Sequence, residues 1–320
     1  MSIYAESREI AERFDRFYDG KGYRVLPSVT ITSGIDPTVY LTNSATNLFK
    51  GYLGGGECLC ARQPSMRTQI LRDFYDRETE TEYPTCFVSF GAFVPPEKLR
   101  KLVDDTVDFH TGIGFLPERM RLRVSARERI LTEYARASRL GGKITRDERD
   151  HKYDHVYGGG LRGRALKLDY YQESLGRYKN LGYFLTIQRG EEILGAEYAS
   201  SDQLILMRRR ELRYGISASP MADILAADTF EQRRFADCVA GYANLVYEGL
   251  MPNSSDTNGR TLKKYIAGVS YFGPKLGTPA DAVPAIAMDY LALAYGEGVR
   301  TDRRLAGALP QALRRVWKDS

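Results

Sequence analysis

The spacing of apolar residues changes once along this chain of 320 residues, near Ser219. Before that point, short stretches rich in Val, Ile, Tyr and Thr are separated by turns, which is the pattern of β-strands. After it, apolar residues recur three and four positions apart from Phe230 to Leu250, which is the pattern of a helix. The change predicts an α+β domain over residues 1–220 and a helical domain over residues 221–320.

Within the first domain the sequence predicts helices as well as strands. Ile10, Phe14 and Tyr18 share one face of a helix expected from Ala5 to Tyr18, and two glycines follow it. Two more helices are expected near residues 96–109 and 126–140. Strands are expected over residues 23–32, 38–42, 58–60, 69–74, 85–90, 119–124, 166–171, 183–189 and 203–208. In the second domain, three further helices are expected around residues 262–269, 286–293 and 305–317.

The composition is that of a globular protein. Hydrophobic residues make up 43% of the chain and charged residues 27%, and no apolar run approaches the roughly 20 residues that a membrane span needs. The first residues alternate charge with apolar side chains, unlike a signal peptide. Four scattered cysteines are too few for a disulfide framework. We therefore expect a cytoplasmic protein with no membrane partner.

Motifs for metal binding and for general hydrolytic chemistry are weak. His151 and His155 have the i, i+4 spacing of two zinc ligands, but no third ligand follows nearby, so we predict no metal site. The glycine triplets at 54–56 and 158–160 lack the Lys and Ser/Thr of a phosphate-binding loop. No nucleophile elbow accompanies the three histidines, so no catalytic triad can be assembled. The net charge of +5 permits contact with a nucleic acid without requiring it, and DNA is not an expected partner.

Four segments of the chain are similar to motifs of one enzyme family. The longest, from Asp36 to Lys50, reads D-P-T-V-Y-L-T-N-S-A-T-N-L-F-K. It is followed by Q-P-S-M-R at residues 63–67, by S-F-G at residues 89–91, and by a stretch of similar spacing at residues 248–264. These segments resemble the catalytic end of alanyl-tRNA synthetase, a class II aminoacyl-tRNA synthetase. The chain looks like a shortened and divergent relative, because the editing and C-terminal domains of that family have no counterpart here.

The resemblance implies a class II synthetase-like fold, in which helices flank an antiparallel sheet and a helical domain follows. It places Arg67 at the motif-two arginine, which holds the α-phosphate of ATP and the carboxylate of the amino acid. The rigid fork of arginine suits that task. The helical domain would resemble the start of the tRNA-recognition domain, with the acceptor end of tRNA, or an aminoacyl-tRNA, as its partner. The resemblance places Asn253, Lys263 and Lys264 in that tRNA-binding segment.

The chain departs from the family where the family binds ATP. An acidic stretch from Glu78 to Glu82 replaces the run of histidine and aromatic residues that builds the adenine site, and we expect a solvated turn there. Pro220 stands where motif three has the arginine that holds the γ-phosphate, and proline carries neither charge nor donor. Two acidic positions of the family become Lys167 and Arg213.

These cations predict a pocket that faces an anion and would repel the ammonium of a free amino acid. We expect Arg67, Lys167 and Arg213 to converge on one cavity, with Arg208 close by at the end of a strand. Clustered positive charges need an anionic partner, either from the ligand or from a carboxylate such as Asp202.

Three functions are compatible with this pattern. The first is transfer of an aminoacyl group from aminoacyl-tRNA to a small-molecule acceptor, as in specialised metabolism, which needs no ATP site. The second is an ATP-dependent amino-acid ligase, with ATP and Mg²⁺ as cofactors. The third is a non-catalytic module that binds tRNA or a protein. The sequence favours the first, which predicts no cofactor, because Arg67 and the tRNA-facing segment remain while motif three is lost.

Overall fold

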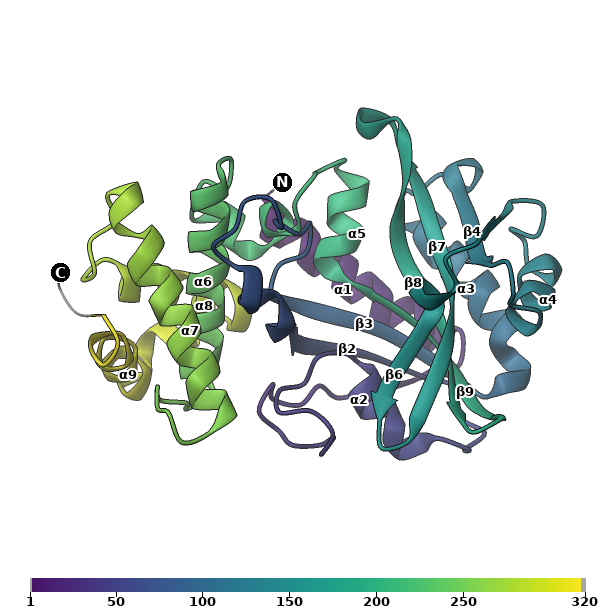
Figure 1. Cartoon of the computed structure of the whole chain (residues 1–320), viewed down its shortest axis with the longest axis horizontal. Helices are drawn as coiled ribbons and strands as arrows, with labels where there is room; N and C mark the ends of the chain where they lie inside the picture. Colours follow the sequence, from purple (N-terminus) through teal and green to yellow (C-terminus); the bar gives the residue numbers. More distant parts are fainter. Residues whose placement is uncertain (1, 318–320) are drawn as a thin grey trace.

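Residues 2–317 are described by a computed structural model, which contains nine strands and nine α-helices (Figure 1). The strands are β1 (Arg24–Leu26), β2 (Leu59–Met66), β3 (Cys86–Val94), β4 (Met120–Ser125), β5 (Ile144–Asp147), β6 (Asp154–Gly158), β7 (Leu161–Gln172), β8 (Arg177–Arg189) and β9 (Glu192–Ser201). The helices are α1 (Ile3–Gly20), α2 (Thr46–Phe49), α3 (Leu99–Gly112), α4 (Ile130–Ala137), α5 (Asp202–Arg209), α6 (Phe230–Tyr247), α7 (Thr257–Phe272), α8 (Val283–Tyr295) and α9 (Arg303–Arg314). Within this part of the chain, no helix is long and apolar enough to cross a membrane.

All nine of these strands belong to one sheet. Its order is β1-β2-β3-β9-β8-β7-β4-β5, and β6 pairs with β7 beside this path. In this order, all neighbouring strands between β2 and β4 (β2-β3-β9-β8-β7-β4) are antiparallel. The pairs at the two edges, β1 with β2 and β4 with β5, are parallel. The expected α+β fold is confirmed, and the two parallel edge pairs are its departure from a purely antiparallel sheet.

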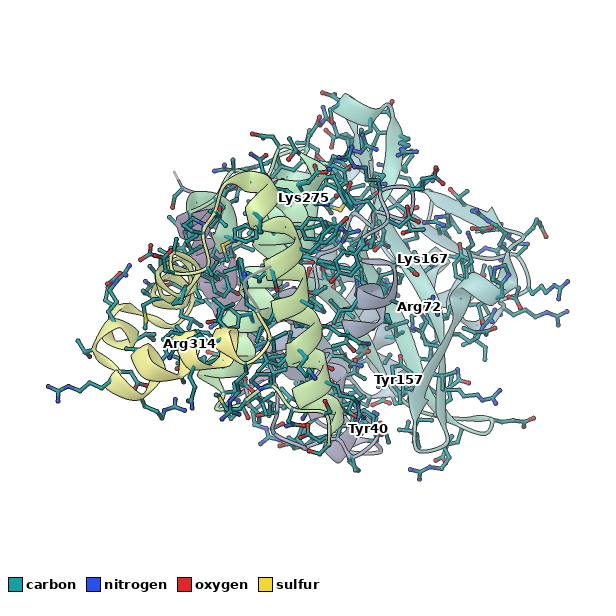
Figure 2. The ribbon with its side chains drawn as sticks, turned by 60° about the vertical axis from the view of Figure 1, so that its left-hand side comes forward. Tyr40, Arg72, Tyr157, Lys167, Lys275 and Arg314 are labelled. Atoms are coloured by element: carbon teal, nitrogen blue, oxygen red, sulfur yellow. The ribbon has the colours of Figure 1, made fainter. Side chains whose placement is uncertain are left out.

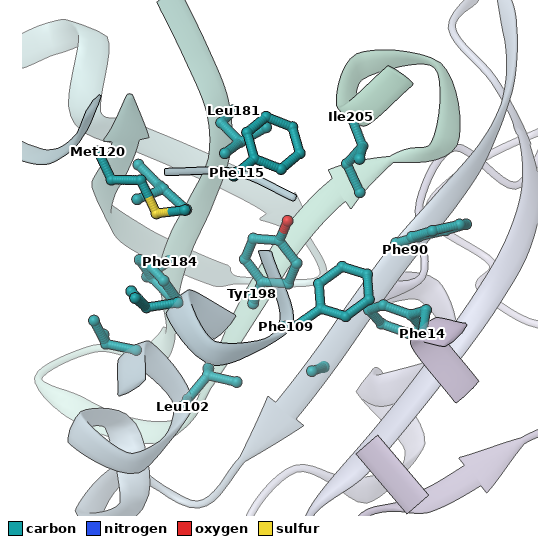
Figure 3. Packing of buried hydrophobic residues seen from close by; sticks show 14 of the residues in the cluster. Phe14, Phe90, Leu102, Phe109, Phe115, Met120, Leu181, Phe184, Tyr198 and Ile205 are labelled. Atoms are coloured by element: carbon teal, nitrogen blue, oxygen red, sulfur yellow. The ribbon is translucent and has the colours of Figure 1, made fainter. Parts of the chain in front are cut away.

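One hydrophobic core lies between the sheet and the helices α1 and α3 (Figure 3). Helix α1 begins where the Ser2 hydroxyl accepts a hydrogen bond from the Ala5 N–H at 3.1 Å. The ring of Phe14 in α1 lies 4.8 Å from that of Phe90 in β3 and 5.3 Å from that of Phe109 in α3. Side chains alternate along a strand, so the residues next to Phe90 face away from this core. That opposite face carries the candidate site.

A second core joins helices α6 to α9 with residues that precede position 220. Helices α6 and α7 approach closely at Gly241, where a Cβ atom would lie 2.2 Å from the ring of Tyr265. Met66 of β2 and Ile216 belong to the same cluster of buried residues as these helices. The helices expected from the apolar spacing are present. The domain boundary at residue 220 stays a prediction, because this core includes residues from both sides of it.

A buried carboxylate connects the helices to the sheet. Asp237 of α6 is 3% exposed, and it accepts hydrogen bonds from the backbone N–H (2.9 Å) and the hydroxyl (2.7 Å) of Thr85. Burial raises the pKa of Asp237 to about 6, and the hydrogen bonds from Thr85 oppose that rise. The carboxylate therefore fixes the start of β3 against α6.

Three strand predictions were wrong, and a fourth was too long. Residues 203–208 lie in helix α5, and residues 69–74 lie mainly in a 3-10 helix. Residues 38–42 form no strand. The strand predicted over residues 23–32 is reduced to the three residues of β1. Helix α5 is buried from its first residue to Arg208, so its apolar residues show no one-sided period. Its start is set by Ser201, whose hydroxyl accepts the Leu204 N–H at 3.1 Å.

Replacing Asp237 by alanine should destabilise the protein by about 1–3 kcal/mol, because the buried N–H of Thr85 would lose its acceptor. Urea unfolding followed by circular dichroism measures the change. The matched control is Asp281→Ala, at an exposed position before α8, which should change the free energy of unfolding by no more than about 0.5 kcal/mol. Equal effects of the two substitutions would contradict the role assigned to Asp237.

Candidate functional site

A cavity of about 360 Å³ lies on the face of the sheet opposite α1 and α3. Its lining includes Asn43, Ser44, Arg67, Ser89 and Gly215. These residues come from the D-P-T segment, the end of β2, the S-F-G segment and the turn ahead of Pro220. The structure thus gathers at one place three of the four segments that carry the synthetase resemblance, although they are far apart in the sequence, whereas residues 248–264 do not line this cavity.

Two contacts explain the local fit of the S-F-G segment. The backbone N–H of Ala45 donates to the Ser89 hydroxyl at 3.1 Å, which holds the end of the D-P-T segment over β3. At Gly91, a Cβ atom would lie 2.6 Å from the Cβ of Ala45 and 2.8 Å from the ring of Phe49. Glycine is therefore required at this position for α2 to pack against the sheet.

Arg67 is the cation that lines this cavity. It directly follows β2, and its backbone N–H donates to the Thr85 carbonyl at 2.7 Å. Its guanidinium carbon lies 5.2 Å from the ring centres of both Tyr83 and Phe87. Within residues 2–317, no carboxylate forms an ion pair with it. Arg67 is thus a guanidinium bracketed by aromatic rings, with its charge available to an anionic or strongly polar ligand.

Lys167 lies on β7, one strand beyond the cavity. It is the register partner of Tyr183, which lines the cavity, whereas Lys167 does not line it. Its ammonium lies 4.4 Å from the ring centre of Tyr153 and 5.8 Å from that of Tyr183. Burial, followed by the charge of Arg123, lowers the pKa of Lys167. No carboxylate of the described chain forms an ion pair with Lys167, because the neighbouring Asp169 pairs with Arg123 at 2.7 Å.

The expected convergence of three cations does not occur. Arg213 is exposed, its guanidinium lies over the ring of Tyr214, and it does not line the cavity with Arg67. Arg208 is fully buried in α5, where it donates to the carbonyl of Asn180 (2.8 Å) and pairs with Glu82 (3.0 Å). Arg208 therefore has a structural role, and the interpretation of Arg208 as a cation at a strand end was wrong.

Asp202 lines a different cavity, on the other side of the β2–β3 hairpin. It is 4% exposed and accepts hydrogen bonds from the Val88 N–H at 3.1 Å and the Ser7 hydroxyl at 3.3 Å. Burial raises the pKa of Asp202 to about 6, against these hydrogen bonds. It is not an anionic partner for Arg67.

The acidic stretch between β2 and β3 is held by ion pairs, so the solvated turn expected there was wrong for two of its glutamates. Both carboxylate oxygens of Glu80 pair with Arg233 of α6 at 2.8 Å, and these side chains are 11% and 9% exposed. Glu82 pairs with Arg208 and with Lys179 of β8. The negative charges are therefore neutralised by the protein itself.

The same stretch packs directly against the turn that resembles motif three. The Gly215 N–H donates to the Glu82 carbonyl at 2.7 Å, and a Cβ atom at Gly215 would lie 2.6 Å from Cδ of Pro84. Pro220 follows in the first turn of a 3-10 helix, as its fixed φ allows. The Ser219 hydroxyl does not cap that helix and donates instead to the Ile216 carbonyl at 2.7 Å.

Glu197 is a buried carboxylic acid that the sequence did not single out. It lies on β9 two residues before Ala199, which lines the cavity, so the two side chains share a face of the sheet. One oxygen accepts a hydrogen bond from the Thr46 hydroxyl at 2.7 Å, and the other has no partner within residues 2–317. Burial raises the pKa of Glu197 to about 8, while Thr46 and Lys50 act against that rise. The alternation E-Y-A-S-S was the available signal for its position.

The three residues assigned to tRNA binding lie around the start of α7. The side chain of Asn253 is engaged within that turn, since its amide donates to Asp256 at 2.7 Å and its oxygen accepts the Ser255 N–H at 3.0 Å. Lys263 donates to the Ser254 hydroxyl at 2.9 Å. Lys264 is exposed. Their contact with tRNA stays a prediction, and Lys264 is the residue best placed for it.

Comparison with known proteins supports a part of the resemblance. No family model matches the chain. A segment of 91 residues is 41% identical to an alanine–tRNA ligase of Cytophaga hutchinsonii, and the match covers 27% of this chain and 10% of that protein. The predicted homology to an alanine–tRNA ligase is thus confirmed for this part of the chain, and the chain spans about a tenth of the length of that curated relative.

Two solved synthetase structures are also similar. The histidyl-tRNA synthetase of S. aureus matches with a TM-score of 0.39 and 11% identity, over 63% of this chain and 70% of that one. A threonyl-tRNA synthetase of Aeropyrum pernix matches with a TM-score of 0.43 and 12% identity, over 78% of this chain and 71% of that one.

The raised pKa of Glu197 predicts a loss of stability with rising pH. The carboxyl ionises near pH 4.5 in the unfolded chain and near pH 8 in the folded protein, so between these values the unfolded chain releases a proton that the folded protein keeps. The free energy of unfolding should therefore fall over this range, by about 1.4 kcal/mol for each unit of pKa difference at most.

Glu197→Gln removes the titration while keeping the shape of the side chain. Urea unfolding at several pH values should show the variant gaining stability relative to the natural protein as the pH rises toward 8. A difference between the two proteins that stays constant over this range would show that Glu197 is not buried as described.

Proposed function

We propose that this protein transfers an aminoacyl group from aminoacyl-tRNA to a small acceptor without using ATP. The proposal depends on two features seen together: the charge of Arg67 in the cavity, and the ion pairs that fix the loop between β2 and β3 beside it. In the described part of the chain, the Arg67 guanidinium has no ion-pair partner, and it lines a cavity built from synthetase-like segments. Glu80 and Glu82 anchor the loop that, by the resemblance, would build the adenine site.

The residues around the cavity do not suit ATP with Mg²⁺. A triphosphate needs several fixed cations, and its magnesium needs carboxylates nearby. Arg67 is the cationic residue that lines this cavity in the described part of the chain, and Pro220 offers no charge where the resemblance expects an arginine. Within residues 2–317, no carboxylate lines this cavity. A substrate that arrives already activated avoids both requirements.

The polar lining suits the chemistry of an aminoacyl ester. In the transfer, the acceptor nucleophile attacks the ester carbonyl, the bond to the terminal ribose oxygen of the tRNA breaks, and the acceptor proton passes to that oxygen. The reaction needs donors directed at the carbonyl oxygen, where negative charge develops. The Arg67 guanidinium and the hydroxyls of Ser89 and Ser201, which all line the cavity, supply such donors.

A stacking surface near the same loop suits the single-stranded end of a tRNA. The rings of Tyr75 and Tyr271 are 47% and 46% exposed, and their centres lie 4.9 Å apart. The Lys275 ammonium lies 3.5 Å from the ring centre of Tyr271, and Arg72 is exposed on the loop after β2 (Figure 2). Aromatic rings combined with cations are the usual means of binding unpaired nucleotides.

The test uses total aminoacyl-tRNA with labelled amino acids, and hydroxylamine as a generic small nucleophile. The protein should form labelled hydroxamate faster than the spontaneous reaction, with no ATP present. Arg67→Ala should slow this about 100-fold, since one preorganised donor is worth roughly 3 kcal/mol in such sites. Arg314→Ala, at an exposed position on α9, should have no effect (Figure 2).

The outcome that overturns the proposal is also specific. No acceleration, together with equal binding of charged and uncharged tRNA, would favour a non-catalytic module. Acceleration that Arg67→Ala leaves unchanged would place the reaction outside this cavity.

A further inference from the structure

We propose that the second cavity, on the other side of the β2–β3 hairpin, binds a small molecule that carries a primary amine on a mainly apolar body. This cavity has a volume of about 550 Å³, within the usual range for small-molecule sites. Its lining residues come mainly from α1, the β2–β3 hairpin, the start of α5 and the end of α8. The proposal is independent of the transfer reaction and concerns a different set of residues.

The charges around this cavity leave one carboxylate without a cation. Its charged lining residues are Arg8, Arg62 and Asp202. Arg8 pairs with Glu12 at 3.1 Å, and Arg62 pairs with Asp15 at 2.5 Å. Asp202 is buried, with 4% of its surface exposed, and yet it forms no ion pair within residues 2–317. A buried carboxylate of this kind favours a cationic partner.

Asp202 also has room for further hydrogen bonds. Its oxygens accept bonds from the Val88 N–H and the Ser7 hydroxyl, and the backbone N–H of Gln203 also stabilises the carboxylate, which offers about four acceptor positions. The adjacent Gln203 lines the same cavity and is 4% exposed, and its side-chain oxygen has no partner in the described part of the chain. Buried polar atoms of this type are normally hydrogen-bonded. Two acceptors side by side match the several donors of an ammonium group.

Asn244, Tyr290 and Tyr295 form a second polar group in the lining of this cavity. The Asn244 amide donates to the Tyr290 hydroxyl at 3.0 Å, and the Tyr295 hydroxyl donates to the Asn244 oxygen at 2.7 Å. The Tyr290 hydroxyl thus accepts one bond, and within residues 2–317 its own proton has no acceptor. It can donate to a hydroxyl or carbonyl at the far end of a ligand.

Between these polar ends the walls are apolar. Ala11, Ile31, Val88 and Phe90 line the cavity, together with the ring of Phe87. Phe87 also lines the cavity of Arg67, and Ser201 of that cavity directly precedes Asp202. The two sites are therefore separate spaces with one shared wall.

The test follows saturation-transfer NMR binding of four probes to the full chain. Tyramine and phenethylamine carry the amine, p-cresol lacks it, and phenylacetate reverses the charge. The two amines should bind saturably and at least about tenfold more tightly than the other two probes, since a charged hydrogen-bonded contact is worth about that factor. Asp202→Asn should weaken amine binding by a similar factor.

A second variant keeps the test valid if Asp202→Asn fails to fold. Ala294 is an exposed residue at the edge of this cavity, so Ala294→Phe should block it without filling the core. The matched control is Ala285→Phe, at another exposed position on α8 that does not line the cavity. Amine binding should be lost in the first variant and retained in the second.

Arg67→Ala separates this site from the candidate transfer site, and it should leave amine binding unchanged. The proposal is overturned if none of the probes binds at millimolar concentration, if p-cresol binds as tightly as tyramine, or if Ala294→Phe has no effect. Loss of amine binding in Arg67→Ala would place the probes in the other cavity and would also overturn it.

Discussion

The loop between β2 and β3 is held in place by buried ion pairs, and both the packing of the helices and the shape of the candidate site depend on it. Glu80 joins the loop to Arg233 of α6, and Glu82 joins it to Arg208 of α5. The Thr85 hydrogen bonds to Asp237 continue the same connection. Removing one member of a buried pair costs about 3–5 kcal/mol, because the other charge stays buried without a partner. The loop is therefore a fixed part of the fold.

This fixed loop determines what the cavity can hold. It packs against Gly215, which also lines the cavity of Arg67, so the loop and the motif-three-like turn form adjoining parts of one wall. Arg67, at the other end of the same loop, has aromatic neighbours, and no carboxylate among residues 2–317 forms an ion pair with it. The acidic residues that would repel a phosphate are instead neutralised internally. The result is a cavity with one directed cation and several hydroxyls, which suits a polar ester better than a polyphosphate.

Part of this arrangement could be predicted from the sequence. The helices after residue 220 follow from the spacing of their apolar residues, and the grouping of Asn43, Arg67 and Ser89 follows from the synthetase resemblance. The partners of Glu80 and Glu82 could not be predicted, because Arg233 and Arg208 lie 153 and 126 positions away in the sequence. Local composition made an acidic solvated turn the simpler interpretation.

Two further differences have a similar cause. The apolar residues of helix α5, 204–207, are consecutive and all buried, so they show no one-sided helical period, and the segment was interpreted as a strand. Asp202 at its start was assigned to the wrong cavity for that reason. The burial of Glu197 could not be predicted either, since a single glutamate in a strand does not indicate whether its side chain is buried.

We propose that the site works on an activated substrate, because Glu80 and Glu82 anchor the loop that, by the resemblance, would build the adenine site. ATP–pyrophosphate exchange, measured with each of the common amino acids, tests this most directly. We expect exchange no faster than the background without protein, for every amino acid. Exchange well above background that Arg67→Ala abolishes would show that the cavity activates an amino acid with ATP, and would contradict the account.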